Sequence, residues 1–318
     1  MSHILVTGAS GFVGSATVAA LARAGHTVRA AVRRSQPTFG AGVEIVQNPD
    51  LTEPCDWRPL LEGVEQVVHL AGIAHSRGVS PDLFDRVNHQ GTAQLAQAAA
   101  QAGVGHFVFV SSIRAQCGPA ADHALTEHDP PAPVDAYGAS KLAAEAAVRA
   151  SGVPFTILRP VALYGPGVKG YFKLLARIAA SPLPLPVKDF GNRRSLLGID
   201  NFISALSFVL ATPTTIGEIY VVADPGIPPR LADVIATLRR ERRRWSFILP
   251  MPTDYLQIPL RLIRRGDMWD RVGGNLRVDP AKLIAAGWRP VHDTLTGLKA
   301  MAQAAAPRKS GTASRSTR

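Results

Sequence analysis

The sequence predicts an α/β fold, with a doubly wound parallel sheet followed by a smaller C-terminal α+β part. In the first two-thirds of the chain, short apolar runs alternate with helical stretches, which is the pattern of βαβ units. A glycine-rich turn, Thr7-Gly8-Ala9-Ser10-Gly11-Phe12-Val13-Gly14, follows the first apolar run directly. Beyond residue 158 the chain becomes richer in proline and glycine, which interrupt regular structure.

The elements are expected in the following order. Strands are predicted over residues 3–7, 27–32, 43–46, 66–70, 106–110, 154–158 and 218–222, the third being short. Helices are predicted over residues 12–24, 83–102, 136–150 and 170–179. Alanine-rich runs such as residues 93–102 suit a helix that packs closely on a sheet, because alanine combines high helix propensity with little bulk.

This pattern divides the chain into three parts. Residues 1–160 are expected to form the main domain. Residues 161–304 are expected to form a smaller part, apart from the strand near 218–222, which returns to the main sheet. Residues 305–318 are expected to be a disordered basic tail. The apolar, proline-containing segment 245–265 is interpreted as a lid, and a peripheral contact with a membrane surface is the alternative.

Composition excludes several classes of protein. Hydrophobic residues make up 46% of the 318 residues and charged residues 19%, a globular balance. No apolar run reaches the ~18 residues that span a bilayer, and the N-terminus lacks the features of a signal peptide. Cys55 and Cys117 lack metal-type spacing. We therefore expect a cytoplasmic protein with no metal site.

The net charge of +11 is concentrated in two places. Residues 239–244 and 307–318 each contribute +4, which leaves +3 for the rest of the chain. No known nucleic-acid-binding pattern accompanies them, so no nucleic-acid partner is expected. A solvated helix end and tail are favoured, and attraction to ligand phosphates or to an anionic membrane is the alternative.

The glycine turn predicts a Rossmann-type dinucleotide site. Gly8, Gly11 and Gly14 permit a tight turn and close approach of backbone N–H groups to a pyrophosphate, and the helix that follows adds a positive field. Ser10, Phe12 and Val13 belong to the same turn. Its position between a first strand and a first helix favours a cofactor site over a simple turn.

The choice between NAD and NADP depends on the end of the second strand. Arg33 and Arg34 stand where an acidic residue would bind the ribose hydroxyls of NAD, and arginine can pair with the 2′-phosphate of NADP. This favours NADP over NAD. Asp50 and Leu51 follow the next apolar run and could bind adenine; an Asp50 helix cap before Thr52 is the alternative.

Tyr137 and Lys141 are candidates for acid/base chemistry. Four residues apart on a helix, their side chains share one face. A phenol has a pKa near ~10, and a neighbouring ammonium favours the phenolate and lowers that pKa. Such a pair can take a proton from an alcohol while hydride leaves the same carbon.

Together these landmarks resemble the extended short-chain dehydrogenase/reductase superfamily, and within it the NAD-dependent epimerase/dehydratase family. The resemblance covers residues 3–300 and is closest to UDP-sugar 4-epimerase-like and 4-reductase-like members. It rests on residues 7–14, Asp50-Leu51, His69-Leu70-Ala71-Gly72, Asn88 with Gly91-Thr92, Ser111-Ser112, residues 137–141, Arg159-Pro160, residues 164–167, Asn192-Arg193-Arg194-Ser195 and Gly287-Trp288-Arg289-Pro290.

The resemblance implies a role for each matching residue. Tyr137 would be the acid/base, Lys141 would hold the nicotinamide ribose and lower the tyrosine pKa, and Ser112 would bind the reacting sugar oxygen. Ser111, one residue earlier on the strand, would point to the other face. Arg194 would bind the substrate diphosphate, and Arg271 is a second candidate. The implied cofactor residues are Gly8, Ser10, Gly11, Phe12, Val13, Gly14, Arg33, Asp50, Leu51, Leu70, Ala71, Gly72, Asn88, Tyr137, Lys141 and Pro160.

Three positions depart from the family pattern. The loop after Ser112 lacks the usual Tyr-Gly, so the alignment of the serine could slip by one. Asn201 stands where many members have a second aspartate after Asp200. The acid that normally ends the second strand is absent.

The predicted function is nucleotide-sugar 4-epimerisation of UDP-hexoses through transient oxidation at C4. An NADPH-dependent 4-ketosugar reductase, favoured by Arg33 and Arg34, stays open. A 4,6-dehydratase is disfavoured because Ile113 and Arg114 follow Ser112 where such enzymes have an Asp-Glu pair. A non-catalytic NAD(P)-binding subunit is disfavoured by the intact catalytic set. The family often dimerises through the tyrosine helix, so a homodimer is expected.

Overall fold

The computed structural model describes residues 1–33, 38–73, 78–168, 191–241 and 274–304, together with Phe172, Leu175 and Ala179. Its centre is a seven-stranded parallel sheet in the order β10-β7-β5-β4-β1-β2-β3. The strands are β1 (His3–Thr7), β2 (Thr27–Val32), β3 (Val43–Gln47), β4 (Gln66–His69), β5 (His106–Val110), β7 (Phe155–Pro160) and β10 (Ile219–Val222). The chain runs outward from β1 in both directions, which confirms the predicted doubly wound α/β fold.

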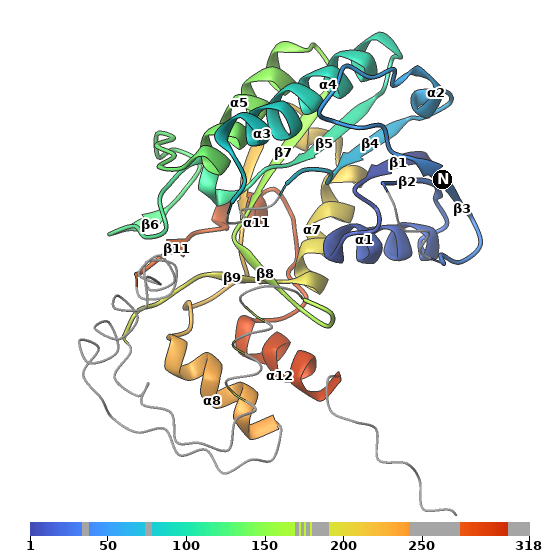
Figure 1. Ribbon diagram of the computed structural model, residues 1–318. Helices are drawn as coiled ribbons and strands as arrows, with labels where there is room; N and C mark the ends of the chain where they lie inside the picture. Colours follow the sequence, from blue (N-terminus) through green and yellow to red (C-terminus); the bar gives the residue numbers. More distant parts are fainter. Residues whose placement is uncertain are drawn as a thin grey trace, which may run out of the picture.

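Helices cover both faces of this sheet. Figure 1 shows α3 (Pro81–Phe84), α4 (Gly91–Gln101) and α5 (Ala136–Ala150) over one face, and α1 (Phe12–Arg23) and α7 (Ile199–Ala211) under the other. The short α2 (Arg58–Leu61) precedes β4. Because helices bury both faces, the central strands are apolar along their length; β5, for example, reads His-Phe-Val-Phe-Val and is almost wholly buried.

One predicted helix contains an irregularity. The sequence pattern predicts a continuous helix over residues 83–102, whereas α3 and α4 are joined by a π-helical turn, Asp85–Gln90. Hydrophobic spacing does not distinguish such a turn from α-helix. It places Asn88 in the interior, where the side chain is 1% exposed. Turns of this kind occur often at functional sites.

The smaller part lies beyond the carboxyl ends of the strands. It contains two-stranded pairs, β6 (Ala124–Leu125) with β11 (Arg277–Val278) and β8 (Ala162–Tyr164) with β9 (Leu196–Gly198). Its helices are α8 (Leu231–Glu241), α11 (Ala281–Ala285) and α12 (Thr294–Ala304), and Figure 1 shows α8 and α12 side by side. The 3-10 turns η2 (Ile113–Ala115) and η3 (Pro213–Thr215) complete the described elements.

Asn201 at the start of α7 links the two parts. Its amide nitrogen donates to Asp224 Oδ1 at 2.7 Å and to the His292 carbonyl at 2.8 Å, and its oxygen accepts from Val291 N at 2.6 Å. An aspartate could not donate to Asp224. The departure from the family pattern at residue 201 is therefore explained by the carboxylate beside it.

Several sequence predictions fall outside the described residues. They concern most of the helix predicted over 170–179, the arginines at 34, 242–244 and 271, the segment 245–265, and the tail from 305. Among the residues described, no helix is long and apolar enough to cross a membrane.

Replacing Asn201 with Asp should lower the free energy of unfolding at pH 7 by about 3 kcal/mol, because two unpaired carboxylates would meet in a buried site. Chemical denaturation at pH 7 and pH 5 measures this, and part of the loss should be recovered at pH 5 as one carboxylate takes up a proton. Ser207→Asp adds the same charge at an exposed position of α7 and is the matched control. Equal losses in the two variants would contradict the explanation.

Candidate active site

The glycine turn after β1 is shaped by two close backbone contacts. Gly8 has φ of +69°, and a Cβ atom there would lie 2.8 Å from Ala71 N. A Cβ atom on Gly14 would lie 2.1 Å from the Gly8 carbonyl oxygen. Both positions therefore require glycine. Gly11 is the N-cap of α1 and no side chain caps this helix, so its first N–H groups face the turn, as an anion-binding turn requires.

His69 ties the turn to the neighbouring strand through a buried chain of hydrogen bonds. Thr92 Oγ1 donates to the Asn88 carbonyl at 2.6 Å, so it accepts from His69 Nε2 at 2.9 Å. His69 Nδ1 must then accept from Thr7 Oγ1 at 2.7 Å. The Thr7 hydroxyl oxygen can therefore accept from the backbone N–H groups of residues 70 and 71. The neutral Nε2–H tautomer alone satisfies all these bonds.

Asn88 extends this chain toward the tyrosine helix. Its oxygen accepts from Ile73 N at 2.8 Å, and its nitrogen donates to the Ile73 carbonyl and to Ser140 Oγ. Ser140 Oγ in turn donates to the Tyr137 carbonyl at 2.8 Å. Gly72 gives this amide room, because a Cβ atom there would lie 2.9 Å from Asn88 Oδ1. The segment 70–73 and helix α5 are thus held in a common frame.

Two cavities meet over the glycine turn. One, of about 500 Å³, extends toward the tyrosine helix. The other, of about 420 Å³, extends over the end of β2. Every described residue predicted to bind cofactor or substrate lines one or both. The first holds Phe12, Val13, Gly14, Asn88, Ser112, Tyr137, Lys141, Pro160 and Arg194; the second holds Ser10, Arg33, Asp50 and Leu51; Gly8, Gly11, Leu70, Ala71 and Gly72 line both.

The second cavity contains the groups suited to an adenosine. Asp50 Oδ1 accepts from Thr52 N and Oγ1, at 3.0 and 2.9 Å, in a turn. The alternative of an Asp50 helix cap is wrong, because the next helix starts only at Arg58. Sequence reasoning missed Asn48, whose buried amide oxygen has no hydrogen-bond partner at this cavity.

Ser112 and Tyr137 come together in the first cavity. Both side chains line this cavity, and the Ser112 hydroxyl lowers the pKa of the Tyr137 phenol against the larger, opposing effect of burial. Ser111 points the other way, as strand alternation predicts, and donates to the buried carboxylate of Glu145 at 2.5 Å. Of the two serines, only Ser112 contacts the phenol.

The start of α5 is held against η2. Asp135 is the N-cap, and its Oδ1 accepts from Gly138 N at 2.7 Å. A Cβ atom on Gly138 would lie 2.2 Å from the Arg114 carbonyl oxygen, so this glycine lets the helix approach. Sequence reasoning missed this contact, although the glycine within the run Tyr137-Gly138-Ala139-Ser140-Lys141 was a signal.

Lys141 is held at the carboxyl end of β5. Its Nζ donates to the Val110 carbonyl at 2.8 Å and lies 4.2 Å from the centroid of the Phe109 ring. Burial lowers the pKa of Lys141 to about 7, against the opposing effect of Glu145. Burial also raises the pKa of Tyr137, and the described cation that opposes this is Arg114.

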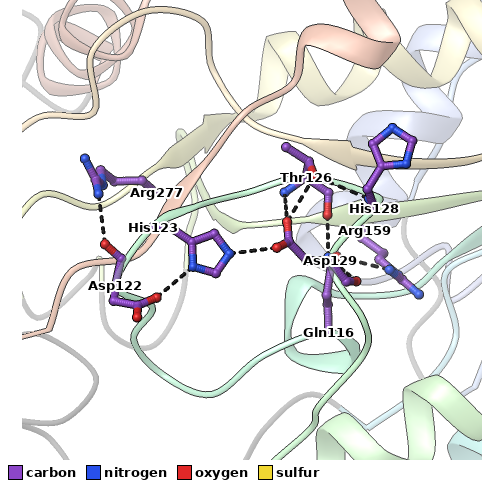
Figure 2. Close-up of polar contacts among 8 residues, drawn as sticks. All are labelled: Gln116, Asp122, His123, Thr126, His128, Asp129, Arg159 and Arg277. Carbon is purple, nitrogen blue, oxygen red and sulfur yellow. Dashed lines mark hydrogen bonds and ion pairs between the residues drawn. The ribbon is translucent and has the colours of Figure 1, made fainter.

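A buried ionic network anchors the same helix. Glu145 accepts two hydrogen bonds from the Arg159 guanidinium, at 3.0 and 2.6 Å. Arg159 also donates to Gln116 Oε1 at 3.0 Å, and the Gln116 amide donates to the carbonyls of Thr126 and Asp129. Figure 2 shows this path from Arg159 through Gln116 to the loop that carries His123. The loop beside the cavity is thus connected to α5 through buried groups.

Arg194 reaches the far wall of the first cavity. Its backbone forms an isolated β-bridge with Leu276, and its guanidinium donates to the carbonyls of Pro119 and Gly274, both at 2.9 Å. These bonds hold the side chain in place.

Among the described residues, no group of His, Cys, Asp and Glu side chains could hold a metal ion.

Comparison with known proteins identifies the family of this chain. The family model described as "NAD dependent epimerase/dehydratase family" matches residues 4–223. The chain belongs to this family. It is therefore an enzyme of the isomerase or oxidoreductase class.

The relatives of this epimerase/dehydratase-family chain include both an epimerase and a reductase. The chain is 32% identical to a UDP-glucose 4-epimerase of Vibrio cholerae over 95% of this chain and 94% of that protein. It is 33% identical to a ceramide reductase of Caulobacter vibrioides over 83% and 74%. A crystal structure of UDP-glucuronic acid 4-epimerase from Bacillus cereus with NAD has the same fold, with a TM-score of 0.76, 22% identity and coverage of 94% and 97%.

The buried histidine allows a test by pH. Burial, with a smaller effect of Lys141, lowers the pKa of His69 to about 3, so the folded protein binds fewer protons than the unfolded chain below pH 6.5. Burial lowers the pKa of His106 to about 4 in the same way. The free energy of unfolding should be fully retained above pH 6.5 and fall steadily toward pH 4.

Long-range ¹H–¹⁵N spectra at pH 5.5 should show His69 neutral with its proton on Nε2. A His69→Gln variant assigns the signal, and His123, whose pKa is raised by its hydrogen bonds to Asp122 and Asp129, should be protonated at this pH. An imidazolium signal from His69 at pH 5.5 would contradict the deduced hydrogen-bond chain.

Proposed function

We propose that this protein is a nucleotide-sugar 4-epimerase that acts on UDP-hexoses. The single observation that carries the proposal is that Ser112, Tyr137 and Lys141 line one cavity, which is continuous with the glycine turn and contains Arg194. The near-full-length similarity to the Vibrio cholerae UDP-glucose 4-epimerase supports the same substrate class.

We assign the roles as follows. Tyr137 takes the proton from the sugar 4-hydroxyl and later returns it, while Ser112 donates to the same oxygen and orients it. Arg194 binds the diphosphate, which keeps the oxidised sugar in the cavity while it turns. Arg271 is proposed as a second diphosphate ligand and lies outside the described residues.

The cofactor is proposed to lie across both cavities. Gly8, Gly11 and Gly14 would admit the pyrophosphate, Asp50 and Leu51 would contact adenine, and Lys141 and Asn88 would lie beside the nicotinamide ribose. Bound there, the nicotinamide would accept hydride from C4 and return it. The buried, partly neutral Lys141 can exchange a proton near neutral pH, which suits a group that relays the tyrosine proton.

A 4-ketosugar reductase is the second candidate. Arg33 lines the adenosine-side cavity where it could meet a 2′-phosphate, and the ceramide reductase of Caulobacter vibrioides is among the relatives. A reductase would consume one NADPH per turnover, whereas an epimerase regenerates its cofactor.

The homodimer is also a proposal; α4 and α5, which would form its interface, lie side by side in Figure 1.

The purified protein should interconvert UDP-glucose and UDP-galactose, or their N-acetyl forms, without net change in NAD(P)H absorbance. Run in D₂O, the reaction should retain hydrogen at C4, because the hydride returns to the carbon it left. Tyr137→Phe should bind cofactor normally and lose about 10²- to 10⁴-fold in kcat. Absence of both interconversion and a 4-keto intermediate would refute the epimerase proposal, and stoichiometric NADPH loss with a 4-ketosugar would select the reductase.

Cofactor preference has its own test. Arg33→Ala should weaken NADP binding about 10- to 150-fold and leave NAD binding nearly unchanged, because a charge-assisted hydrogen bond to phosphate contributes about 1.5–3 kcal/mol. Isothermal titration with each cofactor measures this. Arg23→Ala removes an exposed arginine from α1, away from the cavities, and is the control. Equal weakening for both cofactors would refute an NADP-specific role for Arg33.

A further inference from the structure

Arg114 occupies a central position between the two polar groups of the candidate site. It lies in η2, two residues after Ser112, and its backbone N–H donates to Ser112 Oγ at 3.1 Å. Its carbonyl oxygen is the atom against which Gly138 packs. The backbone of this one residue therefore contacts both the serine and the turn of α5 that carries Tyr137.

The side chain of Arg114 makes a second connection. Its guanidinium pairs with Asp135 Oδ2 at 2.6 Å, while the other oxygen of Asp135 caps α5. Arg114 and Asp135 are only 19% and 26% exposed, so water screens the pair incompletely. Breaking it would free the helix start from η2.

The pair also brings opposite charges to the phenol. Arg114 lines the same cavity as Tyr137, and its Nη1 is buried without a hydrogen-bond partner. Burial has the largest effect on the pKa of Tyr137 and raises it; the Asp135 charge also raises this pKa, and the Arg114 charge offsets part of that effect by lowering it. Among the described residues, the Ser112 hydroxyl also acts on the phenol, the Phe84 ring packs against it edge-on with the ring centroids 5.8 Å apart, and Lys141 lies one turn along the helix.

We propose that Arg114 is a positioning residue for the reaction, which holds Ser112 against Tyr137 through its contacts with α5 and supplies the positive charge that favours the phenolate. The proposal rests on the assigned role of Tyr137.

Two substitutions separate charge from structure. Arg114→Met keeps length but removes the positive charge, and Asp135→Asn removes the negative charge while keeping a good helix cap. If charge acts on the phenol, the two variants move the Tyr137 pKa in opposite directions. If the pair only braces the helix, both variants loosen the same contact and change Tyr137 in the same direction.

The ionisation of Tyr137 can be measured without a substrate. The protein has five tyrosines, so ¹³Cζ-labelled tyrosine should give assignable NMR signals, with Tyr137→Phe identifying the one from Tyr137. At a fixed alkaline pH where circular dichroism shows all variants folded, the ionised fraction should rank Asp135→Asn above wild type above Arg114→Met. The apparent pKa should move by about one unit in each variant.

Turnover is the second readout. Arg114→Met should lower kcat about tenfold at pH 7 and displace the pH–rate profile upward, with NAD(P) affinity unchanged. Arg114→Lys should restore most of the activity. Should Arg114→Met fail to fold, Asp135→Asn and Arg114→Lys still carry the test.

The outcomes distinguish this proposal from the proposed function. Unchanged ionisation, or shifts of the same sign in both charge variants, would overturn the role of Arg114 whatever the substrate is. The expected ranking in a protein that turns over no UDP-hexose would support Arg114 and reject the epimerase assignment.

Discussion

The buried ion pair between Glu145 and Arg159 is the constraint on which the site depends. Their side chains are 0% and 3% exposed, and the guanidinium makes two hydrogen bonds to the carboxylate. Removing one partner of such a pair typically costs about 3–5 kcal/mol, because the other charge stays buried and unpaired. Glu145 is four residues after Lys141 and eight after Tyr137 on α5. Anchoring it to β7 therefore fixes the face that this helix presents to the cavity.

Close backbone contacts complete this positioning. Gly8 lets the first turn approach segment 70–73, Gly14 lets α1 pack on that turn, and Gly138 lets α5 meet η2. In each case the missing side chain removes a steric barrier between two elements. The hydrogen bonds of His69, Asn88 and Ser140 then join the same elements by directional contacts. The two cavities meet where the contacts between β1, β4 and α5 converge.

The electrostatics of the site follow from burial. Tyr137, Lys141 and His69 are each displaced toward their neutral forms, because a poorly hydrated interior disfavours charge. A neutral His69 serves the hydrogen-bond frame, and a lysine near neutrality can exchange a proton. Among the described residues, the charged groups that act on the phenol are the paired Asp135 and Arg114, whose opposite effects on its pKa add to those of burial and the Ser112 hydroxyl.

The sequence alone predicted the fold class, the strands of the main sheet and many of the residues that line the cavities, without Asn48 or Arg114. Those features follow from local patterns: apolar runs predict buried strands, glycines predict tight turns, and spacing by four predicts a shared helix face. Only the tertiary structure decided which charge meets the phenol, why residue 201 is an amide, and how the π-helical turn buries Asn88. Each depends on a neighbour brought close by packing: Arg114 and Asp135 lie 21 residues apart, and Asn201 and Asp224 lie 23 apart. A pKa or a hydrogen-bond partner is a property of the assembled surroundings, and local sequence does not contain it.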